Sequence, residues 1–305
     1  MSAPQEKTQE KVIVVGSGLM GTGIAHAFAA SGYVTVLVDS SAEALARAAQ
    51  AIGKIFADGV RLGKMAASDA DAASARLSTS TDLVAAAAGA VLLVETVTEK
   101  LEVKKAVIAQ ALPVLADNAI IATNTSALSV TEIAASVPGA AERVIGMHFF
   151  NPVHKMKLVE LVRGLATSDD TVARTRAWCD AIRKTSIVVN ESPGLTTSRM
   201  SALLGNEAMF MLQEGTATAE DIDTALRMGF NHPMGPLELG DLTGWDTRLN
   251  VLRYLHQTLG EKFRPCPLII KMVAAGRLGR KTGHGVYKYE DGKCVPNSGL
   301  KGSAL

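Results

Sequence analysis

Two patterns of hydrophobic positions alternate along the first part of the chain. Short runs rich in Val, Ile and Leu, each bounded by turn residues, predict buried β-strands. They occupy residues 11–15, 34–38, 91–95, 119–123, 144–148, 158–162 and 186–189. Longer Ala-rich stretches at 19–30, 42–57, 100–115 and 169–184 predict helices between them. Strands that alternate with helices are typical of an α/β fold, in which helices cover a mostly parallel sheet.

The pattern changes at Ser192-Pro193-Gly194, where proline and glycine interrupt it. Beyond this break, runs of β-branched residues largely vanish, and helical stretches follow at 200–213, 219–228, 236–259 and 268–276. We therefore expect two domains in the 305 residues. Residues 1–190 are predicted to form the α/β domain, and residues 191–305 an all-α C-terminal domain.

Composition and charge narrow the class of protein without assigning a site. The chain has 31 Lys and Arg against 30 Asp and Glu, and this balance gives no reason to expect a nucleic-acid or membrane partner. No apolar run reaches the roughly 18 residues that a membrane span needs. The polar start MSAPQEKTQE lacks the features of a signal peptide or organelle presequence. Three scattered cysteines without a CxxC pair indicate reduced thiols and no metal site, so we expect a cytoplasmic protein.

A glycine-rich turn joins the first predicted strand to the first predicted helix. Gly16, Gly18 and Gly21 form a GxGxxG pattern, with Leu19 and Met20 between the last two glycines. Glycines at this spacing allow a tight turn, close approach of a pyrophosphate and packing of the helix on the strand. The N-terminus of the helix then faces the phosphates. The pattern predicts a Rossmann-type, doubly wound fold that binds a dinucleotide.

Asp39 ends the second predicted strand, 18 residues after Gly21. A carboxylate there accepts hydrogen bonds from the ribose diol of the adenosine and repels a 2′-phosphate. Ser40 and Ser41 follow it, and neither can neutralise such a phosphate as an arginine would. The expected cofactor is therefore NAD rather than NADP.

The segment at 147–160, MHFFNPVHKMKLVE, carries the candidate chemistry. His148 ends one predicted strand and Glu160 lies within the next, so an antiparallel pair joined by a short loop would bring imidazole and carboxylate side by side. A histidine oriented by a carboxylate is a common general base for an alcohol proton. Ser126 follows the strand at 119–123, at the edge where ligands bind in open α/β sheets, and it can donate to a substrate oxygen.

On these residues the chain resembles the L-3-hydroxyacyl-CoA dehydrogenase family, which includes bacterial 3-hydroxybutyryl-CoA dehydrogenases, over nearly its whole length. The similar segments are GSGLMGTGIA, NTSALS, HFFNPVHKMKLVE, HPMGPLELGDLTGWD and GRKTGHGVYKY. The resemblance implies NAD-dependent, reversible oxidation of a 3-hydroxyacyl-CoA, with a short acyl chain expected.

The same resemblance implies a role for each matching residue. His148 is the general base, Glu160 its partner, and Ser126 a contact of the substrate 3-oxygen and of the nicotinamide. The other implied contacts are Glu99, Lys104, Asn151 and Lys281 for the cofactor, and Arg61 and Lys64 in VRLGK for the CoA nucleotide.

One position departs from the family pattern. After the PG dipeptide the family commonly has an asparagine–arginine pair, whose asparagine helps to hold the substrate carbonyls. This chain has Ser198 before Arg199. Either the Ser198 hydroxyl performs a reduced version of that role, or a nearby residue such as Asn206 shares it.

Two other functions stay open at this point. The chain could oxidise a free hydroxy acid or sugar acid, as in the lambda-crystallin branch of the family, but FFNPVHKMKLVE argues against this. It could instead be a non-catalytic NAD-binding protein, which only Ser198 suggests. We expect an acyl-CoA thioester substrate, no nucleic-acid or membrane partner, and a homodimer formed through the C-terminal helical domain.

Overall fold

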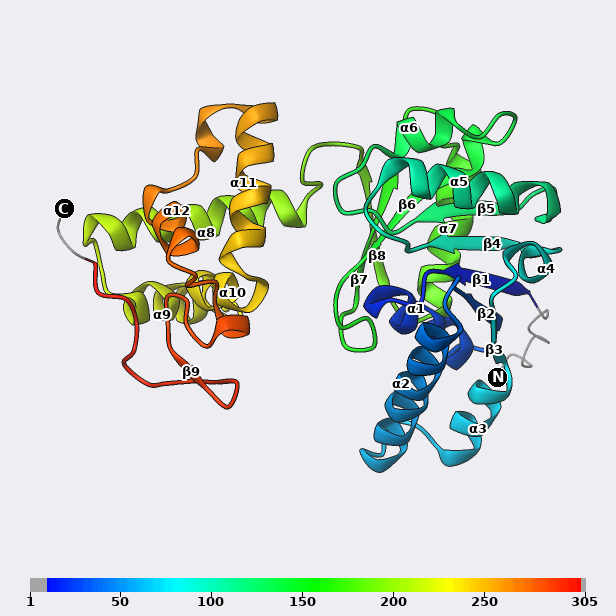
Figure 1. Ribbon diagram of the computed structural model, residues 1–305, viewed down its shortest axis with the longest axis horizontal. Coiled ribbons are helices and arrows are strands. Elements are labelled where there is room, and N and C mark those ends of the chain that lie inside the picture. Colours follow the sequence, from blue (N-terminus) through cyan, green and yellow to red (C-terminus); the bar gives the residue numbers. More distant parts are fainter. Residues whose placement is uncertain (1–9, 303–305) are drawn as a thin grey trace. The chain divides into compact units, whose positions relative to one another are not determined.

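The computed structural model describes residues 10–302 and divides the chain into two compact units (Figure 1). Unit 1 is Met1–Glu191 and unit 2 is Ser192–Leu305. The division falls directly before the turn at 192–194, where Gly194 has a φ of +74° that favours glycine.

Unit 1 is built on an eight-stranded sheet with the order β3-β2-β1-β4-β5-β6-β7-β8. In this spatial order the strands are Leu77–Ser80, Val34–Val38, Lys11–Val15, Leu92–Glu95, Ile120–Thr123, Val144–Phe149, Leu158–Arg163 and Thr185–Asn190. All neighbours are parallel except β6 and β7, which are antiparallel. The order reverses at β1, as in dinucleotide-binding sheets, so the predicted Rossmann-type fold class is confirmed.

Helices cover the sheet and bury its central strands. The helices of unit 1 are α1 Leu19–Ala30, α2 Ala42–Arg61, α3 Ala67–Ala75, α4 Leu83–Ala87, α5 Leu101–Ala111, α6 Val130–Ala135 and α7 Asp169–Ala181, with 3₁₀ turns at Leu112–Val114 and Ala141–Arg143. Val12 and Val14 of β1 pack in one core cluster with Ile24 and Phe28 of α1. Ile13, which points to the other face of the sheet, is equally buried. Burial on both faces explains why these strands have unbroken apolar sequences.

The hydrophobic pattern did not predict every element of unit 1. Helices α3, α4 and α6 and the edge strand β3 were not expected, and α2 extends to Arg61 instead of ending near residue 57. The β3 sequence LSTS contains a single large apolar residue, so its strand conformation depends on parallel pairing with β2.

Unit 2 is helical apart from one short strand pair. Its helices are α8 Thr197–Glu214, α9 Ala219–Gly229, α10 Pro236–Thr243, α11 Trp245–Leu259 and α12 Pro267–Ala274, its 3₁₀ turns are Glu261–Phe263 and Arg280–Thr282, and its strands are β9 Tyr289–Glu290 and β10 Lys293–Cys294. The helical stretch expected at 236–259 is interrupted at Gly244, which has a φ of +94°. Trp245, directly after this break, is fully buried in the core of unit 2.

A buried carboxylate, Asp241, joins two distant parts of unit 2. Its Oδ1 accepts hydrogen bonds from Trp245 Nε1 at 2.6 Å and from the backbone N of Val286 at 2.8 Å. Its Oδ2 accepts from the Tyr287 backbone N at 2.9 Å and the Tyr289 hydroxyl at 3.0 Å. Asp241 therefore ties α10 and α11 to the C-terminal segment.

Asp223 of α9 forms a second link of the same kind. It accepts hydrogen bonds from the backbone N of Leu237 and of Glu238, both in the first turn of α10. It also accepts a hydrogen bond from the Tyr287 hydroxyl at 2.7 Å. A Cβ on Gly235 would lie 2.2 Å from the Asp223 carboxyl carbon, so only glycine fits this approach. The segments HPMGPLELGDLTGWD and GRKTGHGVYKY thus meet in the core of unit 2.

We expect Asp241→Ala to lower the free energy of unfolding of unit 2 by about 3 kcal/mol or more, because it leaves several buried donors without an acceptor. Urea denaturation followed by tryptophan fluorescence measures this change. Asp241→Asn keeps one acceptor oxygen and should lose less. Equal stability of Asp241→Ala and the parent protein would contradict the linking role.

Candidate functional site

The glycine-rich turn lies between the end of β1 and the start of α1, as predicted. Gly16 has a φ of +102°, and a Cβ on Gly21 would lie 1.8 Å from the Gly16 carbonyl oxygen. These two glycines therefore permit the tight turn and the packing of α1. A Cβ on Gly18 would meet no atom of the described residues within 4 Å, so this backbone is open to a ligand. Leu19 is exposed and Met20 packs partly against the core.

Asp39 lies beside this turn, directly after β2. Its Oδ2 accepts hydrogen bonds from the backbone N and the hydroxyl of Ser17, both at 2.8 Å, and its Oδ1 accepts from the Ser41 backbone N at 3.0 Å. Desolvation acts in the opposite direction, but these hydrogen bonds hold the pKa of Asp39 below its usual value. The carboxylate is therefore ionised at neutral pH, next to an open turn at a helix N-terminus. This arrangement fits NAD, with the phosphates at the turn and the ribose at Asp39.

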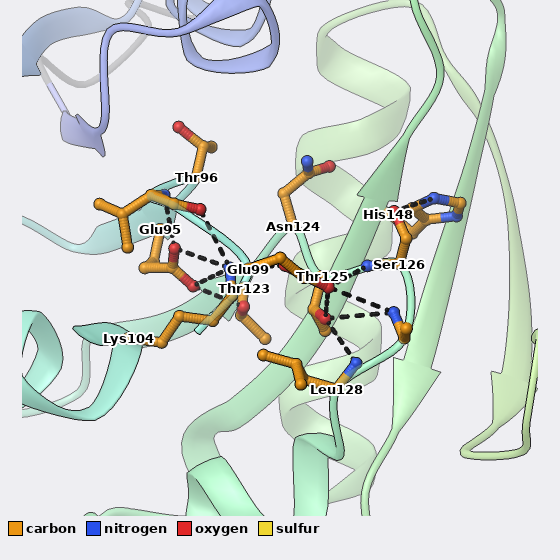
Figure 2. Close-up of polar contacts among 12 residues, drawn as sticks. Glu95, Thr96, Glu99, Lys104, Thr123, Asn124, Thr125, Ser126, Leu128 and His148 are labelled. Carbon is orange, nitrogen blue, oxygen red and sulfur yellow. Dashed lines mark hydrogen bonds and ion pairs between the residues drawn. The ribbon is translucent and has the colours of Figure 1, made fainter. Parts of the chain in front are cut away.

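A fully buried ion pair lies at the carboxyl end of β4 (Figure 2). Lys104 Nζ lies 2.9 Å from Glu95 Oε1 and 3.0 Å from Oε2. Glu95 also accepts hydrogen bonds from the Thr123 hydroxyl and the Val97 backbone N, both at 2.6 Å. The Lys104 ammonium makes a further contact with Glu99, at 3.2 Å. The Lys104 ammonium is therefore paired with two carboxylates of the protein, those of Glu95 and Glu99.

Glu99 connects this ion pair to the turn after β5. Its Oε1 accepts hydrogen bonds from the Thr125 hydroxyl and from the Ser126 backbone N, the latter at 3.0 Å. Desolvation opposes ionisation, but the hydrogen bonds from Thr125 and Lys104 and the charge of Lys104 lower the pKa of Glu99. A charged Glu99 thus fixes the backbone that presents Ser126.

Ser126, His148 and Glu160 form one hydrogen-bonded series. In the antiparallel register of β6 and β7, His148 lies directly opposite Glu160, as expected. His148 Nδ1 is 2.8 Å from Glu160 Oε2, and His148 Nε2 is 3.3 Å from the Ser126 hydroxyl. His148 is buried and Glu160 is fully buried. Since an ionised carboxylate only accepts hydrogen bonds, it favours the tautomer with the proton on Nδ1 and leaves Nε2 free to take a proton.

Asn151 lies in the loop between β6 and β7, residues 150–157, and is exposed. Side chains from other elements hold this loop and the end of β6 that leads into it. The Lys184 ammonium donates to the backbone oxygens of Val153 at 2.5 Å and Met156 at 2.7 Å. Asn124 Oδ1 accepts from the Phe149 backbone N at 2.9 Å.

Three residues that position these groups were not singled out by the sequence. Glu95 orients Lys104, Lys184 supports the β6–β7 loop, and the Thr96 hydroxyl donates to the backbone oxygens of Val15 and Gly16, each at 2.9 Å. Glu95 carried a usable signal, because it is a charged residue at the end of an otherwise apolar strand. Lys184 carried none, because a lysine in a turn after a helix is ordinarily solvated.

The remaining predicted residues are distributed over both units. Arg61 and Lys64 are exposed at the end of α2, and Arg61 pairs with Asp58 at 2.9 Å. In unit 2, Ser198 lies in the first turn of α8. Lys281 forms an ion pair with Asp246 at 2.6 Å.

The suggestion that Asn206 shares a substrate-binding role is wrong. Its side chain is buried, its Nδ2 donates to the Arg264 backbone oxygen, and its Oδ1 accepts from the Cys266 backbone N, both at 2.9 Å. The amide is therefore used within the core of unit 2. Among residues 10–302, no helix is long and apolar enough to cross a membrane, and no cluster of potential metal ligands occurs.

Two family models match almost the entire chain. The model "3-hydroxyacyl-CoA dehydrogenase, NAD binding domain" matches residues 11–192, and "3-hydroxyacyl-CoA dehydrogenase, C-terminal domain" matches residues 194–289. A probable 3-hydroxybutyryl-CoA dehydrogenase of Bacillus subtilis is 40% identical over 92% of this chain and 98% of its own length. A 3-hydroxyadipyl-CoA dehydrogenase of Escherichia coli is 41% identical over 92% of this chain and 59% of its own.

A solved structure agrees with these sequence matches. The (S)-3-hydroxybutyryl-CoA dehydrogenase of Ralstonia eutropha is 41% identical, covers 93% of this chain and 100% of its own, and superimposes with a TM-score of 0.88.

We expect Asp39→Arg to shift cofactor preference towards NADPH, because it removes the repulsion of the 2′-phosphate and adds a cation. The ratio of the dissociation constants for NADPH and NADH, measured by fluorescence titration, should fall by about 10-fold or more. Asp39→Asn is the matched control: it keeps an acceptor for Ser17 and should shift the ratio less. An unchanged ratio in Asp39→Arg would remove Asp39 from the cofactor site.

Glu95→Ala should destabilise unit 1 by about 3–5 kcal/mol, because it leaves the Lys104 ammonium buried without its main partner. The double variant Glu95→Gln with Lys104→Met removes both charges and should recover much of that loss. Chemical denaturation of the parent protein, of Glu95→Gln, of Lys104→Met and of the double variant gives the coupling free energy. Additive effects of the two substitutions would refute a coupled pair.

Proposed function

The chain belongs to the 3-hydroxyacyl-CoA dehydrogenase family, and we propose that it interconverts short-chain 3-hydroxyacyl-CoA and 3-oxoacyl-CoA thioesters with NAD as hydride acceptor. 3-Hydroxybutyryl-CoA, which the names of the Bacillus subtilis and Ralstonia eutropha relatives contain, is the model substrate. The observation that carries the proposal is the hydrogen-bonded series of Ser126, His148 and Glu160, which lies where β5 and β6 end in a Rossmann-type sheet.

In the proposed mechanism, His148 Nε2 takes the proton of the substrate 3-hydroxyl group. The positive charge that then develops on the imidazole is stabilised by Glu160 at Nδ1, 2.8 Å away. The Ser126 hydroxyl, 3.3 Å from Nε2, donates to the same substrate oxygen and keeps it at the base. NAD, when bound, supplies the acceptor for the hydride that leaves C3. In reduction of the 3-oxo group, protonated His148 returns the proton.

The other sequence-predicted residues are assigned binding roles. Asn151 and Lys281 are proposed to contact the cofactor, for which Lys281 must release Asp246, its present partner. Glu99 is proposed to contact the cofactor from the side of the Ser126 turn. Lys104 is fully buried and paired with Glu95, so it is proposed to act on the cofactor through Glu99, whose carboxylate it contacts. Ser198 is proposed to bind a substrate carbonyl oxygen. Arg61 and Lys64 are proposed to bind the CoA phosphates, since both are exposed cations at one helix end.

The two other functions that the sequence left open are less well supported. A non-catalytic NAD-binding protein would have no need for a buried carboxylate bonded to the histidine Nδ1 with Nε2 directed at a serine. A free hydroxy acid as substrate would give the exposed cations Arg61 and Lys64 no phosphate to bind.

We also propose that the protein forms a homodimer through unit 2 and acts in the cytoplasm. Several large apolar side chains of unit 2 are exposed, among them Met200, Met228 and Phe230, and a partner surface would cover them. The free thiols of Cys179, Cys266 and Cys294 fit a reducing compartment.

His148→Ala should lower kcat for NADH-dependent reduction of acetoacetyl-CoA by about 100- to 10,000-fold, because the proton donor is lost. Loss of NADH absorbance measures the rate. NADH binding, followed by fluorescence, should stay near that of the parent protein, since no step of cofactor binding uses the imidazole. The proposed function fails if the parent protein does not consume NADH with this substrate, and the assignment of the base fails if His148→Ala remains near normal.

A further inference from the structure

Unit 2 contains a buried cation whose charge is not balanced. Arg248 of α11 is only 7% exposed. Its Nη1 donates to the Ser201 hydroxyl at 2.8 Å and its Nη2 to the Thr243 hydroxyl at 3.4 Å. Within residues 10–302 these two neutral hydroxyls are the hydrogen-bond partners of the guanidinium, and no carboxylate pairs with it.

The surroundings of Arg248 do not compensate for this burial. Arg248 lies near the N-terminal end of α11, where the helix dipole disfavours a positive charge. Asp246, in the same helical turn, is bonded to the Lys281 ammonium through both carboxylate oxygens, at 2.6 and 2.7 Å. Burial lowers the pKa of Arg248 to about 10, so the guanidinium is still charged at neutral pH. A buried charge of this kind is costly unless an anion meets it.

The Arg248 guanidinium has N–H donors that are not used by these two hydroxyls, and it packs against α8. It has five N–H donors, and two of its nitrogens are used by hydroxyls in this structure. Ser201 and Ser198 are three residues apart on α8 and so share one helix face. A Cβ on Gly205, further along this face, would lie 3.8 Å from the guanidinium carbon, so Arg248 packs against the same face.

The spacing of Ser198 and Ser201 along α8 indicates how far Arg248 lies from a substrate that is bound at Ser198. With a rise of about 1.5 Å per residue, Ser201 lies about 4.5 Å along the helix axis from Ser198. If Ser198 binds a carbonyl oxygen of the substrate, a short methylene spacer reaches from that carbonyl to the guanidinium. An acyl chain of this length that ends in a carboxylate would supply the missing anion.

We propose that Arg248, with the Ser201 hydroxyl, binds a carboxylate at the far end of the acyl chain, and that the preferred substrates are CoA thioesters of dicarboxylic 3-hydroxy acids. The inference rests on the proposed function and names its substrate class. Guanidinium and carboxylate form paired, charge-assisted hydrogen bonds whose geometry an uncharged acyl end cannot reproduce. The chemistry at His148 is the same for both kinds of acyl chain.

The test compares NADH-dependent reduction of 3-oxoadipyl-CoA, which ends in a carboxylate, with that of acetoacetyl-CoA, which does not. The parent protein should have the higher kcat/KM for 3-oxoadipyl-CoA. In Arg248→Met, the ratio of the two kcat/KM values should fall by about 10- to 100-fold, chiefly through KM for the dicarboxylic substrate. Arg248→Lys keeps the charge without the paired donors and should lose less of the ratio.

A second variant and a folding control separate binding from structure. Ser201→Ala removes only the hydroxyl that orients the guanidinium and should lower the same ratio by roughly 2- to 10-fold. Thermal denaturation of each variant checks that unit 2 is folded, and Arg248→Met should fold because it removes a buried charge.

Two outcomes would overturn the inference, and they are distinguishable. If the parent protein reduces acetoacetyl-CoA and the ratio is the same in Arg248→Met, Arg248 has only a structural role and the proposed function stands. If the parent protein reduces neither substrate, the proposed function fails and the inference fails with it.

Discussion

The geometry of the proposed active site in unit 1 depends on a single reversal of strand direction. Strands β3 to β6 in the sheet are parallel, and β7 runs against β6, so a short loop can join them. This reversal places His148, at the end of β6, opposite Glu160 in β7. A shift of the register by one residue would turn the Glu160 carboxylate to the other face of the sheet and leave the imidazole without its partner. The contact between His148 and Glu160 thus depends on the register of β6 and β7 as well as on the two side chains.

Beside this pair, a series of charged side chains, of which Glu95 and Lys104 are fully buried, supports the turn that carries Ser126. Glu95 holds Lys104, Lys104 contacts Glu99, and Glu99 holds the backbone of the Ser126 turn. The backbone of Ser126 is therefore held by a series of residues from strand β4, helix α5 and the loop between them. Such a network costs desolvation free energy, but its hydrogen bonds restrict the conformation of the turn.

Much of the fold and part of the site could be predicted from the sequence. The apolar strands of unit 1, the glycine turn, Asp39 and the pairing of His148 with Glu160 all have local signals, because strand period and turn chemistry determine them. Elements whose stability comes from pairing alone, such as β3, had no such signal. The same limit applies to Lys184 and Arg248, since a sequence does not reveal that a charged side chain will be buried. Asn206 shows the converse error, because an amide near a predicted site proved to be part of the core.

The links made by Asp223 and Asp241 also determine when each unit can fold during synthesis. The core of unit 2 needs Tyr287 and Tyr289, which lie close to the end of the chain and bond to these two carboxylates. Unit 1 is complete at Glu191, and its sheet uses no residue from beyond that point. We therefore expect unit 1 to be able to fold on the ribosome while unit 2 is still being translated, and unit 2 to fold only after Tyr289 has emerged. Before that point, α9 and α10 lack the hydrogen bonds that Tyr287 and Tyr289 donate to Asp223 and Asp241.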